Sequence, residues 1–220
     1  CTPSGLHGEM AIAAANAGKH IVCEKPIEIT TQKVDQIIEA VEKNKIKFQS
    51  IFQRRTMPAA IAVKDLIEHG KMGKIVLASA YLKYYRDQAY YNSAGWRGTW
   101  ELDGGGALMN QGIHGIDLLN WMVGQKVVSI FAKADHLARD IEVEDTAVAL
   151  MQYSGGGYGV IEGATTCYPG LDTKFEIHGE KGTVIFTDSG IEKWEFIGEN
   201  IPMPETGEKI GGSSNPADIS

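Results

Sequence analysis

The chain has 220 residues, of which 43% are hydrophobic and 22% charged, and its formal net charge is −7 at pH 7. This length and composition are typical of a soluble globular protein with one large domain or two small ones. The acidic balance provides no basic stripe to neutralise phosphates, which excludes a nucleic-acid surface, and no apolar run approaches a membrane span in length.

The chain contains three cysteines, at Cys1, Cys23 and Cys167. Their spacing matches neither a CxxC pair nor a set of metal ligands, and the chain opens without a secretory signal pattern. We therefore expect reduced thiols, a cytoplasmic protein and no metal site.

Both ends of the sequence look abrupt. It begins with Cys rather than Met, and its first residues resemble the loop that follows a strand. The last residues, KIGGSSNPADIS, resemble a loop that leads into another element, and the polar tail from Pro202 onward is expected to be mobile. We expect a fragment that is cut at both ends.

The first fifty residues alternate between helical and strand patterns. Ser4 is a candidate N-cap, Gly18 ends the first helix, and Thr30 or Thr31 caps the second. The predicted elements are a helix over Leu6–Ala17, a strand over His20–Cys23, a helix up to Asn44 and a strand over Lys47–Phe52. Such alternation with short connections predicts the second half of a doubly wound α/β sheet.

Glu24-Lys25-Pro26 directly follows the first of these strands. Ligands of such sheets bind outside the carboxyl ends of the strands, so this tripeptide lies at a candidate site. Partial burial there would lower the pKa of Lys25 and make proton transfer near neutral pH feasible. A strand-end lysine that points to solvent is the alternative.

A change of pattern follows residue 56. We predict a helix over Met57–His69 and then a long strand over Lys74–Tyr85. The segment Tyr84–Trp100 has no clear period and is dense in aromatic residues and arginine. Such a loop can cover a polar, ring-shaped ligand, although an ordered surface loop or a subunit contact would have the same composition.

The segment Asp103–Trp121 is predicted to be a helix that Asp103 caps, with three glycines that let the backbone approach a bound group. Asn110 and His114 are four residues apart and so neighbours on its surface, and Asp117 is placed to orient the histidine ring. His114 can exchange protons near neutral pH. An N-capped core helix with a satisfied polar side is the alternative.

Strand patterns and tight turns fill most of the remaining sequence. We expect a meander of antiparallel strands that forms one open sheet. The second face of an open sheet needs to be covered, which makes a homodimer or homotetramer plausible. The predicted strands are Val127–Ala134, Thr146–Tyr153, Gly157–Thr166, Lys174–His178, Thr183–Thr187 and Ile191–Phe196.

Four motifs occur in a specific order between Thr2 and Asp117: TPSGLH from Thr2, Glu24-Lys25-Pro26, Gly95-Trp96-Arg97-Gly98 and GGGALMNQGIHGID. Together they resemble the marks of the glucose-fructose oxidoreductase and inositol dehydrogenase family, Gfo/Idh/MocA. The resemblance implies the C-terminal part of a Rossmann domain for NAD or NADP over residues 1–53. It also implies an α+β substrate and oligomerisation domain with a large, open, mostly antiparallel sheet over residues 54–220.

The phosphate-binding G-x-G-x-x-G turn of such a Rossmann domain does not occur in the sequence. By analogy with the fold, we expect roughly 90 residues of the cofactor domain to precede Cys1. The fragment by itself is therefore not expected to hold the cofactor tightly.

The resemblance also implies residue roles. Lys25 would be the catalytic lysine, and His114 the acid/base that accepts the hydroxyl proton. The family commonly has Asp where this chain has Asn110, which leaves Asn110 a hydrogen-bonding role. The implied cofactor-side residues are Thr2, Pro3, His7, Glu24, Lys25, Trp96 and Arg97, and the implied substrate-side residues are Tyr84, Tyr85, Arg86 and Tyr168.

The resulting hypothesis is an NAD(P)-dependent oxidoreductase that acts on a secondary hydroxyl of a sugar, sugar derivative or cyclitol. Its expected partner is a sugar-like small molecule, with neither nucleic acid nor membrane. A non-catalytic sugar-binding or scaffold relative of the same fold stays open, as does an oligomerisation module, because fold and function are separate claims.

Overall fold

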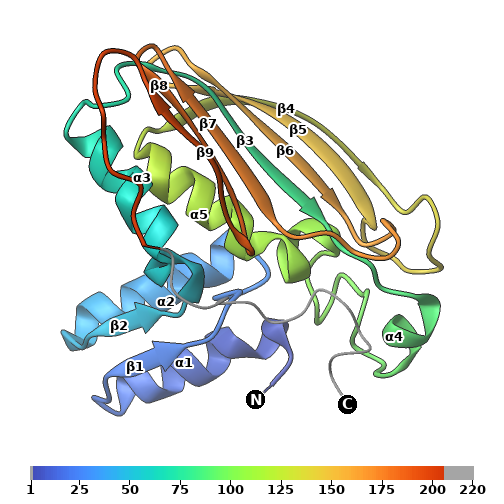
Figure 1. Ribbon diagram of the computed structural model, residues 1–220. Coiled ribbons are helices and arrows are strands. Elements are labelled where there is room, and N and C mark those ends of the chain that lie inside the picture. Colours follow the sequence, from blue (N-terminus) through green and yellow to red (C-terminus); the bar gives the residue numbers. More distant parts are fainter. Residues whose placement is uncertain (1, 206–220) are drawn as a thin grey trace.

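The computed structural model describes residues 2–205. It contains a small two-stranded parallel sheet with two flanking helices and a large seven-stranded sheet (Figure 1). The expectations for Cys1 and for the last fifteen residues lie outside the described residues. Among residues 2–205, no helix is long and apolar enough to cross a membrane.

The small sheet carries the predicted alternation of helix and strand. Ile21 pairs with Phe48 in parallel register, and Thr30 caps the second helix by accepting a bond from the Lys33 amide at 3.3 Å. Ser4 is not the predicted cap, since it lies inside a 3₁₀ turn that has no side-chain cap. The elements are η1 (Ser4–Leu6), α1 (His7–Asn16), β1 (Ile21–Cys23), α2 (Thr31–Asn44) and β2 (Phe48–Ser50).

The middle of the chain departs from two predictions. The segment expected to be a loop contains a short helix, which Asp87 caps through the Tyr90 amide at 2.8 Å. The single helix expected from Asp103 is also wrong, because its first turns are replaced by a π-helix. The elements are η2 (Gln53–Thr56), α3 (Pro58–Glu68), β3 (Ile75–Lys83), α4 (Gln88–Asn92), the π-helix η3 (Ala107–Gln111) and α5 (Ile113–Val123).

Glu144 explains the late start of this helix. Its carboxylate accepts the backbone amides of Gly106 and Leu108, both at 2.9 Å, and its carbonyl accepts the Ala107 amide at 2.8 Å. A helix leaves its first amides unsatisfied, and a distant carboxylate satisfies them here. A Cβ on Gly106 would overlap the Glu144 carbonyl, so this glycine approaches the protein's own backbone.

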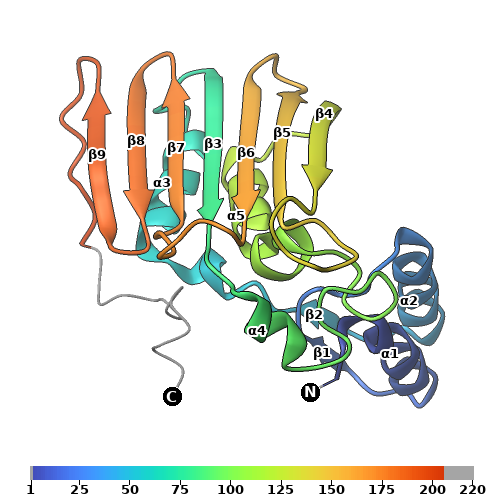
Figure 2. The same cartoon turned by 90° about the vertical axis from the view of Figure 1, so that its right-hand side faces the viewer.

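The large sheet is not the predicted meander. Its order is β4-β5-β6-β3-β7-β8-β9, so β3 separates two antiparallel groups and pairs parallel to β6 and antiparallel to β7 (Figure 2). The remaining strands are β4 (Val127–Asp135), β5 (Thr146–Tyr153), β6 (Tyr158–Ala164), β7 (Lys174–Gly179), β8 (Gly182–Thr187) and β9 (Gly190–Phe196).

Helices α3 and α5 cover one face of this sheet (Figures 1 and 2). Phe175 and Phe186 stack there with ring centroids 5.0 Å apart, and both are fully buried. Gly115 lets α5 approach β3 closely, because a Cβ at this position would overlap the side chain of Leu82. The core thus fixes α5, and with it His114, against the centre of the sheet.

Candidate active site

The carboxyl end of β1 meets the π-helix at Lys25. The Lys25 Nζ donates to the backbone carbonyl of Asn110 at 2.8 Å, across 85 residues of sequence. The Glu24 carboxylate accepts the Lys25 backbone amide at 3.2 Å. The structure therefore brings together Lys25 and Asn110, two of the three residues expected to be catalytic.

Burial and the neighbouring charges act in opposite directions on the pKa of Lys25. Burial lowers the pKa of its ammonium, whereas the carboxylates of Glu24 and Asp103 raise it. The side chain is partly buried, so it differs from a lysine that points freely to solvent.

His114 lies in the first turn of α5, edge-on to Phe52 with ring centroids 6.0 Å apart. Burial, together with the positive charges of Lys25 and Arg54, lowers its pKa to about 4. Among the described residues, its buried Nδ1 has no hydrogen-bond partner. A ring with this pKa is neutral at pH 7, so it can serve there as a proton acceptor, although a weak one.

The prediction that Asp117 orients His114 is wrong. Asp117 receives Arg55 in a two-point ion pair, from Nε at 2.8 Å and from a terminal nitrogen at 2.5 Å. An arginine fork matches a carboxylate in this way, and it turns the aspartate toward η2. The same turn holds Arg54, which pairs with Asp188 at the β8–β9 turn.

Asn110 is held by Asp103. The Asn110 amide nitrogen donates to one Asp103 carboxylate oxygen at 2.6 Å, and the Gly98 amide donates to the other at 2.9 Å. Asp103 is only 2% exposed, and burial raises its pKa against the lowering effect of these bonds and of Arg97 and Lys25.

The segment Tyr84–Trp100, which is rich in aromatic residues and arginine, folds back toward Asp103 and the π-helix. Arg97 lies over the Tyr90 ring at 4.4 Å and over the Trp96 ring at 4.7 Å, and it donates to the Tyr90 hydroxyl at 2.6 Å. Gln111 donates to the same hydroxyl at 3.0 Å and accepts from Arg86 at 3.1 Å. Trp96, Arg97 and Arg86 are thereby linked to the π-helix.

The three tyrosines expected on the substrate side lie in different surroundings. Tyr84 is 6% exposed and its hydroxyl bonds Thr173 at 3.0 Å, so it belongs to the core. Tyr85 packs edge-on against Tyr168 at 5.2 Å, and Tyr168 is 79% exposed. Of the three, Tyr85 and Tyr168 are thus accessible, and Tyr84 is not.

Most of the expected cofactor-side residues gather beside α1 and β1. Thr2, His7 and Glu24 line one pocket of about 250 Å³ there. The His7 Nδ1 lies 2.7 Å from the Pro26 carbonyl, and Pro3 directly precedes the 3₁₀ turn. This group therefore adjoins the Glu24-Lys25-Pro26 segment.

Three residues near the site were missed in the sequence: Arg54, Gln111 and Glu144. Arg54 follows β2 just as Lys25 follows β1, so the strand-end rule could have identified it. Gln111 lay inside a recognised motif without being singled out. For Glu144 the sequence carries no signal, because its partners lie 36 and 38 residues away.

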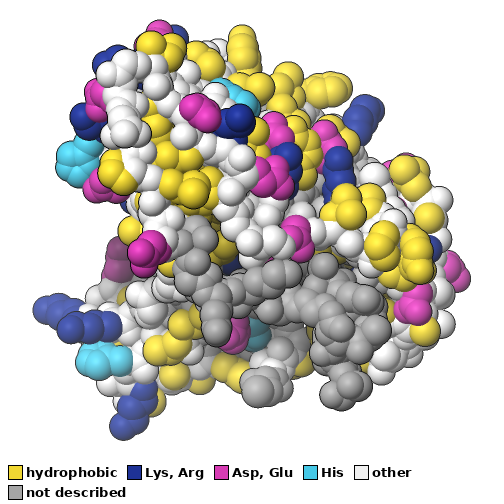
Figure 3. All heavy atoms as spheres, in the orientation of Figure 1, with side chains coloured by type: hydrophobic (Ala, Val, Ile, Leu, Met, Phe, Trp, Pro, Cys, Tyr) yellow, Lys and Arg dark blue, Asp and Glu magenta, His cyan; other side chains and the backbone are white. Residues whose placement is uncertain are grey.

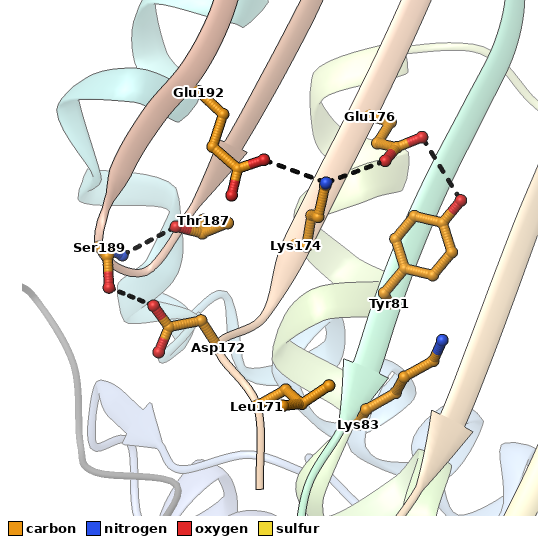
Figure 4. Close-up of a pocket in the computed structure, with 9 residues that line it drawn as sticks. All are labelled: Tyr81, Lys83, Leu171, Asp172, Lys174, Glu176, Thr187, Ser189 and Glu192. Carbon is orange, nitrogen blue, oxygen red and sulfur yellow. Dashed lines mark hydrogen bonds and ion pairs between the residues drawn. The ribbon is translucent and has the colours of Figure 1, made fainter.

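A second, larger pocket of about 460 Å³ lies on the face of the large sheet opposite α3 and α5 (Figure 4). Lys174 bridges Glu176 at 3.3 Å and Glu192 at 3.0 Å within it, and Tyr81 bonds Glu176 at 3.4 Å. None of the predicted site residues lines this pocket.

Two family models match the sequence, the oxidoreductase family with an NAD-binding Rossmann fold over residues 1–52 and the GFO/IDH/MocA C-terminal domain over residues 60–185. Levoglucosan dehydrogenase from Pseudarthrobacter phenanthrenivorans is 33% identical over 211 residues, which are 84% of this chain and 53% of that protein. Myo-inositol 2-dehydrogenase from Thermotoga maritima is 29% identical over 86% of this chain and 55% of its own length.

Solved structures are also similar. The WlbA dehydrogenase from Bordetella pertussis, in complex with NADH and UDP-GlcNAcA, is 39% identical with a TM-score of 0.87 over 92% of this chain and 62% of that chain. A levoglucosan dehydrogenase in complex with NADH has a TM-score of 0.82 at 27% identity, over 98% of this chain and 61% of that chain. The chain spans about half the length of the curated relatives it matches. It belongs to the Gfo/Idh/MocA family of oxidoreductases.

Proposed function

We propose that the protein is an NAD(P)-dependent oxidoreductase that transfers a hydride between the nicotinamide and a secondary hydroxyl of a sugar, sugar derivative or cyclitol. The observation that carries the proposal is the joint placement of Lys25, fixed at the end of β1, and His114, whose pKa is lowered to about 4. A proton donor and a neutral proton acceptor are what the oxidation of an alcohol requires.

The residues present fit a nicotinamide cofactor. Thr2, His7 and Glu24 share one pocket beside β1, and Pro3 adjoins it. Trp96 and Arg97 would close on the cofactor from the aromatic segment. When bound, the nicotinamide supplies the hydride acceptor.

His114 would accept the proton of the substrate hydroxyl on its imidazole. Lys25 would donate a hydrogen bond to the same oxygen from its ammonium, which favours the developing negative charge. The Asn110 side chain cannot take a proton. Its amide nitrogen is held by Asp103, while the backbone carbonyl of the same residue would hold the Lys25 ammonium.

Tyr85, Arg86 and Tyr168 are the residues we assign to the substrate side. Tyr84 is left out because its hydroxyl is bonded to Thr173 inside the core. The ligands named for the relatives define the assay panel: UDP-GlcNAcA, levoglucosan and myo-inositol. A pyrophosphate or uronic carboxylate would find its counter-charge in arginine.

The test uses the full-length protein with Lys25→Met and His114→Ala. Each substitution should lower kcat by roughly a hundredfold to ten-thousandfold, the range for lost acid-base catalysis. Lys19→Met and His136→Ala are matched controls at exposed positions and should leave kcat unchanged.

Unchanged turnover in both site variants would contradict the assigned roles. Asn110, which replaces an acidic residue common in the family, keeps a non-catalytic sugar-binding relative as the second candidate. Thermal stabilisation by a sugar, with no turnover of any panel member by the full-length protein, would favour that candidate.

We further propose that the protein is a homodimer or homotetramer through the large sheet. Within residues 2–205, no helix covers the face opposite α3 and α5, and Figure 3 shows hydrophobic side chains interspersed with charged ones over the sheet. A large exposed apolar face supports a subunit contact. The exposed apolar residues on this face include Leu77, Phe131, Val148, Leu150 and Tyr158.

A cytoplasmic location completes the proposal. Cys23 and Cys167 both carry free thiols, which a reducing compartment preserves.

A further inference from the structure

The Asp103 carboxylate is a deeply buried charged group that acts on Lys25. It is 2% exposed, and a buried carboxylate is costly unless its oxygens are bonded and its charge is compensated. It belongs neither to a recognised motif nor to the set of residues expected to be catalytic. The hydrogen-bond partners of the Asp103 carboxylate therefore indicate its role.

Each oxygen of this carboxylate has a different partner. One accepts the Asn110 amide nitrogen at 2.6 Å, and the other accepts the Gly98 amide at 2.9 Å. The backbone carbonyl of the same Asn110 accepts the Lys25 Nζ at 2.8 Å. Asn110 therefore connects Asp103, which its side chain contacts and which binds the Trp96-Arg97-Gly98 turn, with the lysine, which its main chain contacts.

The charges around this path are few. The positive charges of Lys25 and Arg97 face Asp103, and Glu24 is the other carboxylate that faces Lys25. Asn110, which lies between Asp103 and Lys25, is uncharged. The negative charge that faces Lys25 is therefore provided by Glu24 and by Asp103 rather than from position 110.

We propose that Asp103 is a positioning residue that supplies the negative charge Asn110 lacks and, through Asn110, holds the Lys25 ammonium in place for reaction. This inference rests on the proposed oxidoreductase function. Asp103 does not touch the substrate in this scheme; it acts through Asn110 and Lys25.

A purely structural role would have a different signature. Asp103 also closes its own turn, since its backbone amide bonds the Thr99 carbonyl at 3.2 Å and its side chain accepts the Gly98 amide. A residue that only fixes a turn would change stability when replaced. It would leave kcat unchanged in the folded enzyme.

The test is an exchange of the two side chains. Asp103→Asn removes the charge at nearly constant shape and leaves one acceptor oxygen for two donors. Asn110→Asp alone would set two carboxylates against each other. In the double variant D103N/N110D, the new amide at 103 can accept from Gly98 and donate to the new carboxylate at 110, so charge and bonds are both restored.

In the full-length protein we expect D103N to lower kcat by roughly tenfold to a hundredfold, the range for a lost charge-assisted bond, with a smaller change in KM. Because Asp103 raises the Lys25 pKa, its loss should shift the alkaline limb of the kcat/KM profile to lower pH. The double variant should recover most of kcat and the position of this limb.

A second measurement does not depend on turnover. After reductive ¹³C-methylation of lysines, the Lys25 resonance, assigned with Lys25→Arg, reports the pKa of this side chain by NMR. The pKa should fall in D103N and return in the double variant. If the parent protein oxidises no sugar, the proposed function fails but this titration still decides the role of Asp103.

Two outcomes would overturn the inference. One is a D103N variant with lowered thermal stability but the parental kcat, pH profile and Lys25 titration, which would leave Asp103 as a turn-fixing residue. The other is a folded double variant that recovers neither activity nor the Lys25 pKa.

Discussion

Lys25 and His114 show how one environment acts differently on two bases. Burial disfavours the charged form of both, but Lys25 starts from a high reference pKa and is supported by two carboxylates. His114 starts near 6.5, and the neighbouring Lys25 and Arg54 charges lower its pKa further. The pKa values of both side chains are thus lowered, and the His114 imidazole is neutral at pH 7.

This difference can be measured at His114. Its pKa should be about 4, against 6.5 in the unfolded chain, so its contribution to stability is present above pH 6.5 and is lost as the pH falls toward 4. Lys25→Met should raise the His114 pKa, because it removes a nearby positive charge. NMR titration of the ring protons measures both values, with Lys19→Met as the control.

A His114 pKa near 6.5 in the parent, or one that does not respond to Lys25→Met, would contradict this account of the site.

At the level of single elements, caps and strand ends were predictable where the partner is close in sequence. Thr30 caps α2 through an amide three residues away, and Pro58 starts α3. The start of α5 was not predictable, since Glu144 satisfies the amides before it. Residue spacing suggested that Asp117 faces His114, but η2 supplied a stronger partner in Arg55.

The packing of α5 on β3 leads to a prediction for Gly115. A Cβ there would overlap the Leu82 side chain, and such overpacking costs about 1–3 kcal/mol of unfolding free energy. Alanine recovers roughly 1 kcal/mol of this because it favours the helix more than glycine does. Gly115→Ala should therefore destabilise the protein by the difference. Urea unfolding of the full-length protein measures the difference. Gly95→Ala, at a position with open space, should be nearly neutral; a Gly115→Ala variant as stable as the parent would refute the packing argument.

Across the whole molecule, contacts between distant segments assemble the site. Lys25 reaches Asn110 over 85 residues, and Arg54 reaches Asp188 over 134 residues. The large sheet holds α5 on one face and leaves its other face to the proposed subunit contact (Figure 2). The same sheet would therefore support both the candidate site and the proposed assembly.

The proposed assembly can be tested at Leu150, which is 48% exposed on the open face of β5. Leu150→Lys should shift the full-length protein toward monomer, because it buries a charge in an apolar contact. Light scattering after gel filtration gives the mass. Ile38→Lys, at an equally exposed apolar position on α2, is the matched control, and a parental mass for Leu150→Lys would argue against this face.

The residue pattern was sufficient to predict the α/β class, the elements of the small sheet, the run of strands and the family, whereas the roles of Lys25, Asn110 and His114 stay predictions. These features depend on periodicity, caps and motifs that are complete within a few residues. The position of β3 inside the sheet, the π-helix, the pairing of Asp117 with Arg55 and the burial of Asp103 and Tyr84 emerged only from the folded chain. Each of them depends on which distant group satisfies a buried donor, acceptor or charge, and local spacing does not encode that choice.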